Sequence, residues 1–594
     1  MPRGMFGAEI ERHRTYTDKV IIKRLLYYVK PFIKQLIIAT VLALIIVALD
    51  LIGPLLVSET LDSLGADPIV FSRIIVVVVV YFVALALSAF ISYKQTILLQ
   101  VTGQKIIYDI RGDVFKHIES LSIETYNHIP IGKLVTRVTS DVDTLNTLYT
   151  DVIINLFRNA ITIIGVFVIM FVLDWKLTLL ILIVTPFIFL ASFLFRKYAR
   201  KAYGNVRNSL ANINAFLSEH LTNMKLIQIF NREDRKYEEF KVRNKSLNHS
   251  YLQQMFTFSI YRPMMYLLYI TAMIIVLWQG SLDAMIGVIT YGILYAFTQY
   301  VRKFFNPIQD LAEKYDVLQA AFTAGERIFE IMDTEPIVSD KPDAIDLTGL
   351  KGKIEFRHVW FAYNDDDWIL KDVSFVVNPG ETLALVGATG SGKTTIINLI
   401  VRNYDIQKGE ILIDGIDIRD IEIASLRRQI GQMPQDVFLF SGTVSSNVKL
   451  LDEAISDAEV KKAAKYVNAD RFIEKLQDKY EEPVRERGNN FSAGERQLLS
   501  FARTIAHDPA IMILDEATAN IDTETEALIQ KSLSKMMHIG TMIVVAHRLS
   551  TIQHSDHILV MQKGRIIESG NHQELLKQKG YYYGLCRLQY DRPE

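Results

Sequence analysis

The sequence predicts a multidomain membrane protein in which an all-α, six-helix transmembrane domain precedes an α/β domain of the P-loop, RecA-like class. Three observations predict this fold class. Apolar stretches long enough to cross a bilayer are confined to the first half of the chain. From Lys353 onward, β-rich segments such as IEFRHVWFAY alternate with helical ones. One β-rich segment runs directly into a glycine-rich loop that matches a phosphate-binding motif.

Composition narrows the class of protein. Half of the 594 residues are apolar and 22% are charged. The 65 basic and 66 acidic residues give a net charge of −1, which gives no sign of a polyanion-binding protein of the histone or ribosomal kind. Cys586 is the single cysteine, so an intramolecular disulfide framework and a multi-cysteine metal site are excluded. The N-terminus lacks an apolar core, so we expect no cleavable signal peptide.

Six apolar stretches are candidates for membrane spans. A hydrocarbon layer of about 30 Å requires about 20 helical residues, and each stretch approaches or exceeds that length. The first contains Asp50 and the third contains Arg158, whereas the other four carry no charge. Charges at membrane depth are costly, so we expect these two to face a cavity or a partner. The predicted spans are Leu36–Val57, Ile74–Tyr93, Val152–Leu173, Leu177–Phe195, Pro263–Gly280 and Ala284–Val301.

Basic residues set the expected orientation of these spans. Lys and Arg are frequent before the first span, after the sixth, and in the two long connections that follow spans 2 and 4. We therefore expect a multi-pass protein of the plasma membrane whose N- and C-termini are both cytoplasmic. Both long connections have helical spacing of apolar residues and should extend the spans beyond the membrane. The predicted outer connections are Ser58–Arg73, Asp174–Lys176 and Ser281–Asp283.

The phosphate-binding motif runs from Gly387 to Thr394 with the pattern G-x-x-x-x-G-K-[ST]. A strand-like segment, Thr382–Val386, precedes it and a helical segment follows it, as the motif requires. Glycines let such a loop turn its amide N–H groups toward phosphate oxygens. We expect Lys393 to reach the outer phosphates and the Thr394 hydroxyl to ligate Mg²⁺. The predicted loop comprises Gly387, Ala388, Thr389, Gly390, Ser391, Gly392, Lys393, Thr394 and Thr395.

A second apolar segment, Ile511–Leu514, runs into two carboxylates, Asp515 and Glu516. Asp515 suits support of the Mg²⁺ shell, and Glu516 is placed to polarise an attacking water. Acidic residues are common where strands end, so the pattern alone is weak. With the phosphate loop upstream, it indicates hydrolysis of a nucleoside triphosphate.

With these motifs the chain resembles the ATP-binding cassette (ABC) exporters, in which six membrane helices are fused to one nucleotide-binding domain. The resemblance covers essentially the whole length and depends on several motifs in the expected order. It implies ATP and Mg²⁺ as ligands and ATP hydrolysis coupled to transport. The matching positions are Tyr363 in WFAY, Gln435 in MPQDVFLF, the signature segment Phe491–Glu495, Asp522 in NID and His547 in VVAHRLS.

The resemblance also implies a role for each matching residue. Tyr363 would stack on adenine. Gln435 would touch Mg²⁺ and the attacking water, and would face the transmembrane domain. His547 would contact the γ-phosphate. The predicted catalytic residues are therefore Glu516, His547 and Gln435. The predicted Mg²⁺ ligands are Thr394 and Gln435. The predicted ATP-binding set further includes Asp515, Ser492, Gly494 and Asp522.

The signature segment departs from the family pattern. Two nucleotide-binding domains of this family enclose two ATP molecules, each between one phosphate loop and the other domain's signature, so a dimer is implied. Ala493 adds a Cβ where backbone approaches phosphate, and Glu495 brings a negative charge toward a polyanion. We therefore hypothesise a heterodimer whose partner has a consensus LSGGQ signature and a degenerate Walker B, the strand-end motif that is Ile511–Glu516 here, with a residue other than Glu at the position of Glu516. A homodimer with a drifted signature is the alternative.

The resemblance divides the chain into four parts and suggests its activity. Residues 1–32 would form a cytoplasmic segment with an elbow helix, 33–320 the transmembrane domain, 321–350 a linker and 351–594 the nucleotide-binding domain. We predict efflux of hydrophobic or amphipathic compounds, drugs included, by alternating access. A lipid flippase or a peptide exporter is the alternative, and no nucleic-acid partner is expected.

The contacts to the cargo and between the domains are less defined. The resemblance implies that short helices near Arg111–Leu121 and Asn205–Ala215 transmit motion between the domains. Aromatic and Met side chains accommodate varied apolar ligands, although ordinary helix packing explains them equally well. The candidate cargo residues are Met264, Met265, Tyr266, Tyr291, Tyr295 and Phe297.

Overall fold

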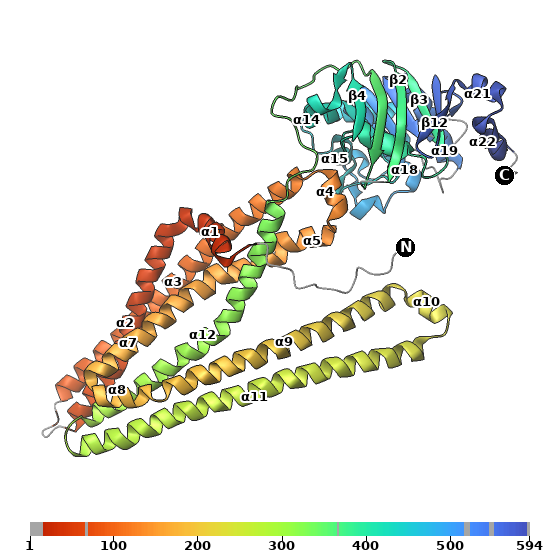
Figure 1. The fold of residues 1–594 in the computed structure, drawn as a ribbon. Helices are drawn as coiled ribbons and strands as arrows, with labels where there is room; N and C mark the ends of the chain where they lie inside the picture. The colour runs from red at the N-terminus through yellow and green to blue at the C-terminus, as the bar shows by residue number, and fades with distance from the viewer. Residues whose placement is uncertain are drawn as a thin grey trace. The chain divides into compact units, whose positions relative to one another are not determined.

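The computed structural model describes residues 16–65, 69, 71–364, 367–515, 523–545 and 552–590. The chain divides into two compact units (Figure 1). The helical unit comprises Met1–Glu119 and Ile131–Thr334, and the P-loop unit comprises Ser120–Pro130 and Glu335–Glu594. A short piece of the N-terminal half, which contains α4 (Ile123–His128), therefore belongs to the P-loop unit.

The helical unit consists of long helices joined by short turns. Among the residues that the structure describes, five helical stretches are long and apolar enough to cross a membrane, namely Asp18–Leu64, Phe71–Ser120, Ile131–Leu173, Trp175–Thr222 and Glu233–Met285. The elements are α1 (Asp18–Val29), η1 (Lys30–Phe32), α2 (Ile33–Leu64), α3 (Phe71–Ser120), α5 (Ile131–Thr136), the π-helical turn η2 (Arg137–Asp141), α6 (Val142–Thr147), the π-helical turn η3 (Leu148–Val152), α7 (Ile153–Leu173), α8 (Trp175–Leu182), α9 (Thr185–Thr222), α10 (Met224–Ile229), α11 (Glu233–Met285) and α12 (Tyr291–Met332).

The first five predicted spans fall within these stretches, but the sixth does not form one helix. α11 continues to Met285 and α12 begins at Tyr291, so the predicted span Ala284–Val301 straddles the turn between them. The predicted outer connection Ser281–Asp283 lies inside α11 for the same reason. Gly287 in this turn has a φ of +74° and reverses the chain within a run of apolar residues. A count of six spans therefore stays a prediction.

The membrane helices share an apolar core. α2, α7 and α12 pack together, and inside that core the Tyr300 hydroxyl of α12 donates to the carbonyl oxygen of Leu51 at 2.6 Å. α9 and α11 pack along each other as a long hairpin that α10 closes (Figure 1). None of the six residues of α10 is buried, and Leu226, Ile229 and the following Phe230 are exposed. The hairpin thus ends in an apolar surface that the described part of this chain leaves uncovered.

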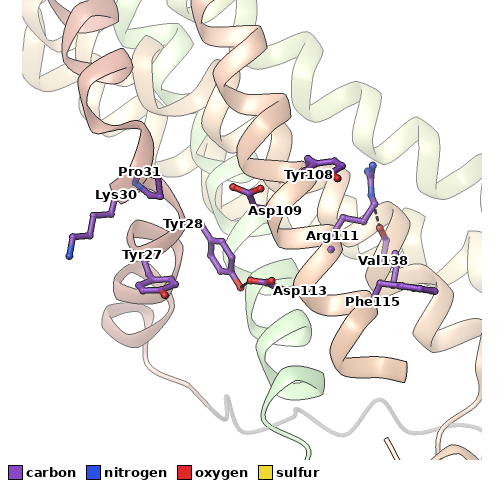
Figure 2. A pocket seen from close by; sticks show the side chains of 11 residues that line it. Tyr27, Tyr28, Lys30, Pro31, Tyr108, Asp109, Arg111, Asp113, Phe115 and Val138 are labelled. Atoms are coloured by element: carbon purple, nitrogen blue, oxygen red, sulfur yellow. Dashed lines mark hydrogen bonds between the residues drawn. The ribbon is translucent and has the colours of Figure 1, made fainter. Parts of the chain in front are cut away.

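The N-terminal helix α1 is tied to two other helices. Arg24 forms an ion pair of 2.8 Å with Asp333, which caps the C-terminal end of α12. Tyr16 donates its hydroxyl hydrogen to the same carboxylate. The Tyr28 hydroxyl donates to Asp113 of α3 at 3.1 Å, beside a cavity of about 840 Å³ (Figure 2). The start of the described chain is therefore fixed to both α3 and α12.

α12 reaches further along the chain than the predicted transmembrane domain. It runs to Met332, so the first part of the predicted linker at 321–350 is helical. The division between the two units falls between Thr334 and Glu335. Beyond it, Ile345 forms a parallel bridge with Ile421 of the P-loop unit.

The P-loop unit contains short helices and twelve named strands among its described residues. Its strands are β1 (Ile354–Ala362), β2 (Trp368–Val377), β3 (Thr382–Gly387), β4 (Lys408–Ile413), β5 (Ile416–Asp417), β6 (Ile430–Met433), β7 (Gly442–Thr443), β8 (Pro483–Val484), β9 (Ile511–Asp515), β10 (Thr541–Val545), β11 (His557–Gln562) and β12 (Arg565–Gly570). Besides α4, its helices are α13 (Lys393–Ile400), η4 (Ile418–Asp420), α14 (Ile423–Arg428), α15 (Val444–Lys449), α16 (Asp457–Tyr466), α17 (Asp470–Ile473), η5 (Lys479–Glu481), η6 (Glu486–Gly488), α18 (Ala493–Ala506), α19 (Thr523–Met536), α21 (His572–Gln578) and α22 (Tyr581–Tyr590).

Two sheets organise this unit. The six-stranded sheet has the order β12-β11-β3-β10-β9-β6, and every neighbouring pair is parallel except β12 with β11. The four-stranded sheet is antiparallel with the order β2-β1-β4-β5. Apolar clusters cover both faces of the parallel strands, which explains why β3, β9 and β10 read as continuous apolar runs. The predicted α/β fold of this half is confirmed.

Candidate nucleotide site

The predicted phosphate loop connects β3 to α13, as the motif requires. Gly390 and Gly392 have φ values of +80° and +105°, which residues with a Cβ rarely adopt. A Cβ on Gly392 would also lie 2.7 Å from the Leu370 side chain. Ala388, Thr389 and Gly390 are exposed, so the loop presents its backbone at the surface above the carboxyl end of β3.

Polar groups of this loop fit a polyphosphate. The Ser391 hydroxyl is buried and has no hydrogen-bond partner among the described residues. The Lys393 ammonium donates to the loop's own carbonyl oxygens, at 2.8 Å to Gly387 and 3.1 Å to Ala388. Burial lowers the pKa of Lys393, and the neighbouring Asp515 carboxylate opposes that shift. Phosphate oxygens would give both donors an acceptor at the N-terminus of α13, where helix amides favour anions.

The second predicted strand lies where the motif logic expects it. In the parallel sheet β10 lies between β9 and β3. Asp515 of β9 pairs in register with Val545 of β10, and Val545 pairs in register with Leu385 of β3. Asp515 therefore ends at the same sheet edge as the phosphate loop. Thr394 and Gln435 are both exposed, and Gln435 follows β6, the neighbour of β9. Three predicted residues, Glu516, Asp522 and His547, lie outside the described residues.

Tyr363 directly follows β1 and belongs to an aromatic group. Its ring meets Phe361 and Tyr404 edge to face, with centroids 4.9 and 5.0 Å away. Its hydroxyl lies 3.2 Å from the hydroxyl of Thr395, which is buried in α13. Tyr363 nevertheless remains 39% exposed, so part of its ring is available to a planar ligand.

The signature segment forms the start of α18. The Ser492 hydroxyl accepts a hydrogen bond from the Glu495 amide at 3.3 Å, and the Glu495 carboxylate accepts one from the Ser492 amide at 2.8 Å. This reciprocal pair is a capping box. Gly494 is buried, whereas Ser492 and Ala493 are exposed. Both the hydroxyl and the carboxylate are thus engaged within the signature itself.

A contact that the sequence analysis missed connects α4 to this region. The Asn127 side-chain amide of α4 donates to the Tyr404 hydroxyl at 2.5 Å. Burial raises the pKa of Glu124, on the same helix, and the nearby Asp405 carboxylate adds to that shift. The predicted contact helix at Arg111–Leu121 is wrong, because those residues continue α3 and the separate helix begins after Ser122.

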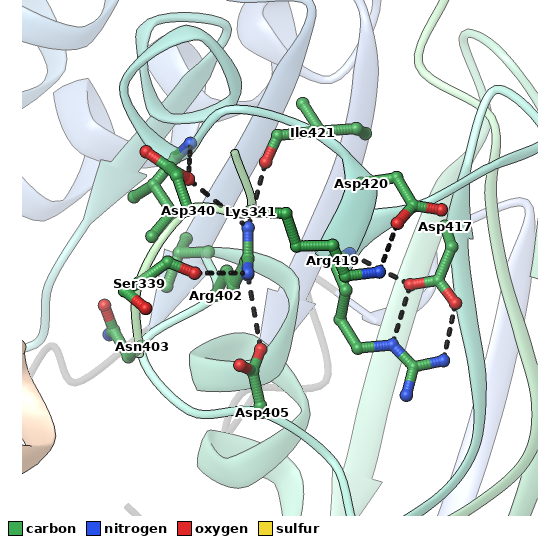
Figure 3. A network of polar contacts seen from close by, with 12 residues as sticks. Ser339, Asp340, Lys341, Arg402, Asn403, Asp405, Asp417, Arg419, Asp420 and Ile421 are labelled. Carbon is green, nitrogen blue, oxygen red and sulfur yellow. Dashed lines mark hydrogen bonds and ion pairs between the residues drawn. The ribbon is translucent and has the colours of Figure 1, made fainter. Parts of the chain in front are cut away.

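The segment that carries Tyr404 is held by a buried cation (Figure 3). Arg402 is 2% exposed and donates to the carbonyl oxygens of Ser339 at 3.1 Å and Ile421 at 2.9 Å. It also pairs with Asp405 at 3.2 Å. Since the Arg402 side chain is itself buried and bonded on three sides, it fixes the turn after α13 that carries Tyr404.

The predicted cargo residues lie in different environments. Met265 and Tyr266 border a cavity between α11 and α12, which supports their candidacy. Phe297 is fully buried in the apolar core of the helical unit, as the packing interpretation expects. Asp50 lies on α2, where its carboxylate accepts a hydrogen bond from Ser88 at 3.2 Å. Tyr291 and Tyr295 remain exposed on α12, and Met264 packs against the core.

The fold and this site define a membrane-anchored P-loop protein built to bind a nucleoside triphosphate. Two family models match the chain: the ABC transporter transmembrane region over residues 36–308 and the ABC transporter model over residues 370–519. The chain belongs to the ABC transporter family.

Relatives and a solved structure agree with this assignment. "Probable multidrug resistance ABC transporter ATP-binding/permease protein YheH" of Bacillus subtilis is 40% identical over 516 residues, which cover 85% of this chain and 75% of the relative. An "ATP-dependent lipid A-core flippase" of Desulfotalea psychrophila is 34% identical over 584 residues, covering 96% and 100%. A bacterial Atm1-family ABC exporter with ATP bound matches with a TM-score of 0.79 at 27% identity, covering 94% and 99%. The chain is thus a multi-pass ABC exporter that couples ATP hydrolysis to transport.

Proposed function

We propose that this chain is one half of a heterodimeric exporter that moves hydrophobic or amphipathic compounds, drugs included, across the plasma membrane by alternating access. Both termini lie in the cytoplasm, where ATP is available. Closure of two nucleotide-binding domains around ATP turns the membrane cavity outward, and hydrolysis separates the domains again. The cargo leaves the protein chemically unchanged.

In this proposal the described loop holds the triphosphate. Lys393 and the unpaired Ser391 hydroxyl donate to phosphate oxygens, and the exposed face of Tyr363 stacks on adenine. The Thr394 hydroxyl and the Gln435 side chain hold Mg²⁺, with support from Asp515. When bound, Mg²⁺ supplies positive charge that offsets the charge developing on the phosphates.

The proposed catalytic roles are those that the ABC exporter resemblance gives to residues at matching motif positions. Glu516 polarises the attacking water and His547 contacts the γ-phosphate, while Gln435 links the metal to the membrane domain. Asp522 completes the set at the dimer interface. Support comes from the position of Asp515, which brings the end of β9 to the edge of the sheet where the phosphate loop lies.

Two features support an assembly of two chains. The P-loop unit supplies one phosphate loop and one signature, whereas each ATP needs a loop and a signature from different domains. The tip of the α9–α11 hairpin exposes Leu226, Ile229 and Phe230, and apolar side chains gathered at such a tip favour burial against a partner.

The negative charge of Glu495 is the observation that carries the heterodimer proposal. The capping box holds this carboxylate at the start of α18, where a phosphate would bind, although the Ser492 hydroxyl only accepts in the box and keeps its O–H for donation. A signature with this added charge binds ATP poorly. We therefore assign productive hydrolysis to this chain's phosphate loop and Walker B with a partner's consensus signature. The partner's degenerate Walker B would face the weak signature.

Glu495→Gln tests this assignment, because Gln keeps the capping box but removes the charge. In a heterodimer the productive site does not use this signature, so the ATPase rate should change less than about twofold. A homodimer would use it at both sites, and the rate should rise about tenfold. Glu486→Gln, which removes an exposed carboxylate shortly before the signature, is the control. Full drug-stimulated ATPase activity of a dimer of this chain alone would also reject the heterodimer.

A lipid flippase is the second candidate. The 34% identity to a protein named as a lipid A-core flippase favours it. ATP-dependent movement of a labelled lipid between leaflets, without accumulation of dyes inside inverted vesicles, would favour the flippase over the efflux function.

A further inference from the structure

Two cations, Arg302 and Lys303, lie on α12 directly after the predicted sixth span. α12 begins at Tyr291, directly after the turn that follows α11. Arg302 is eleven residues further along the helix, which at about 1.5 Å per residue is roughly 17 Å from that end. If α12 crosses a hydrocarbon layer of about 30 Å from its first residue, as a sixth span would, Arg302 and Lys303 fall near the middle of that layer. The predicted span ending at Val301 would instead have left both cations in the cytoplasm.

A cavity of about 540 Å³ opens beside Arg302, between α11 and α12. Met265, Tyr266 and Tyr269 of α11 and Phe305 of α12 form most of its wall. The rings of Tyr269 and Phe305 meet edge to face with centroids 5.8 Å apart. Aromatic and Met side chains of this kind accommodate apolar bodies of varied shape.

Two guanidinium groups border the same cavity. Arg262 of α11 and Arg302 are both exposed, and neither forms an ion pair with a residue that the structure describes. The adjacent Lys303 differs, because its ammonium donates to the carbonyl oxygen of Asp50 at 2.6 Å. A cation at membrane depth is costly unless an anion or water compensates it. Lys303 is thus compensated by a carbonyl oxygen of the protein, whereas the Arg302 guanidinium has no ion-pair partner among the described residues. An anionic ligand would supply that partner.

The larger cavity of Figure 2 lacks this combination of charges. There Arg111 donates to the carbonyl oxygen of Val138 at 3.2 Å and pairs with Asp143 at 3.0 Å. Asp109 and Asp113 add two carboxylates to the lining. An anion would find no unpaired guanidinium among these lining residues.

We propose that the cavity between α11 and α12 binds the acidic group of an amphipathic cargo through Arg302 and Arg262. This inference depends on the proposed export function and narrows its cargo to compounds that carry a carboxylate, sulfonate or phosphate on an apolar body. A guanidinium binds such groups through paired hydrogen bonds, and the low dielectric at this depth strengthens the attraction. The apolar body packs on Tyr266, Tyr269 and Phe305.

The test uses the assembled exporter, with its partner subunit, in sealed phosphatidylcholine vesicles. Two fluorescent amphiphiles that differ only by a carboxylate against a carboxamide are offered with MgATP. Wild type should transport the acid with a kcat/KM about tenfold above that of the amide. Arg302→Gln should reduce this preference to about twofold, with the larger loss of kcat/KM on the acid. Arg302→Lys, which keeps the charge, should restore most of the preference.

Lys303→Gln is the matched control, because it removes the neighbouring charge on the same turn. It should leave the preference for the acid intact. Equal losses for acid and amide in Arg302→Gln would show a structural role and overturn the inference, while the export function would stand. Wild type that transports neither compound would refute the export function as well.

A second arm separates an acidic cargo from an acidic bilayer lipid. Added phosphatidylglycerol should slow uptake of the acid if its headgroup enters the same cavity, and Arg302→Gln should abolish that slowing. This result would support the acid-binding site and identify lipid as one occupant. An acid preference that persists in the double variant Arg262→Gln/Arg302→Gln would overturn the site.

Discussion

At the scale of single residues, the signature segment combines two functions that conflict. Ser492 and Glu495 satisfy each other's amides and so stabilise the start of α18, by about 1 kcal/mol for a cap of this kind. The Ser492 hydroxyl keeps its O–H for donation, but the Glu495 carboxylate that completes the cap adds a negative charge that a bound phosphate would meet. Local helix stability is therefore gained at the expense of affinity for the partner's nucleotide.

Replacing Glu516 by Gln should lower the ATPase rate at least about 100-fold while ATP binding persists, because the amide cannot polarise water. Hydrolysis and nucleotide affinity measured on the same sample check this expectation. Glu381→Gln removes a carboxylate that accepts from Asn378 outside the site and serves as the control. Substantial residual hydrolysis by Glu516→Gln would contradict the proposed role of the glutamate.

At the scale of elements, a chain of contacts connects Tyr363, the proposed adenine-stacking residue, to α4. Tyr363 meets Tyr404 edge to face at 5.0 Å, and Tyr404 accepts the hydrogen bond of Asn127. Arg402 ties the turn that carries Tyr404 to the carbonyl oxygens of Ile421 and Ser339. Since α4 follows α3 in the chain, a ligand on Tyr363 should influence a membrane helix through these side chains.

Tyr404→Phe should reduce the amount of cargo moved per ATP about fivefold, because it keeps the ring but removes the acceptor of the Asn127 bond. Transport and hydrolysis are measured in the same vesicles. Tyr466→Phe is the matched control, since it deletes a hydroxyl that donates to the carbonyl oxygen of Lys535. The double variant Tyr404→Phe/Asn127→Ala should lose no more cargo moved per ATP than Tyr404→Phe alone. Additive losses would show that the two side chains do not act through their common hydrogen bond.

Sequence patterns predicted the elements that depend on local information. The phosphate loop and five spans could be predicted because the spacing of glycines and the length of an apolar run can be read from a short stretch of sequence. The end of α11 was mispredicted because Ile286, Val288 and Ile289 keep the turn apolar while Gly287 reverses the backbone. The Ser-x-x-Glu spacing at α18 did contain a capping-box pattern. The bond from Asn127 to Tyr404 joins residues 277 positions apart, so no window contains it.

At the scale of the whole molecule, the exposed hairpin tip and the single phosphate loop both indicate that the functional exporter contains a second subunit. Ile229 is 68% and Phe230 65% exposed at the tip. Burying such side chains against a second subunit would contribute about 1.5 to 3 kcal/mol each. Assembly, rather than internal packing, is therefore what we expect these residues to stabilise.

Phe230→Ser should lower the fraction of assembled dimer about tenfold without changing the thermal stability of the chain, since this side chain has little contact to lose. Native mass spectrometry of the purified exporter measures the dimer fraction. Leu588→Ser removes a similarly exposed side chain on α22 and should leave it unchanged. An unaltered dimer fraction in Phe230→Ser would exclude the tip from the interface.

The tie between α1 and the end of α12 has a practical consequence for handling the protein. Tyr16 and Arg24 both hold Asp333, which lies next to the division between the units. Truncation past Tyr16, or a bulky fluorescent fusion placed immediately before it, would remove or disturb the hydrogen bond that helps hold α1 to the end of α12. Affinity tags and reporters for functional work therefore belong after α22, at the opposite terminus.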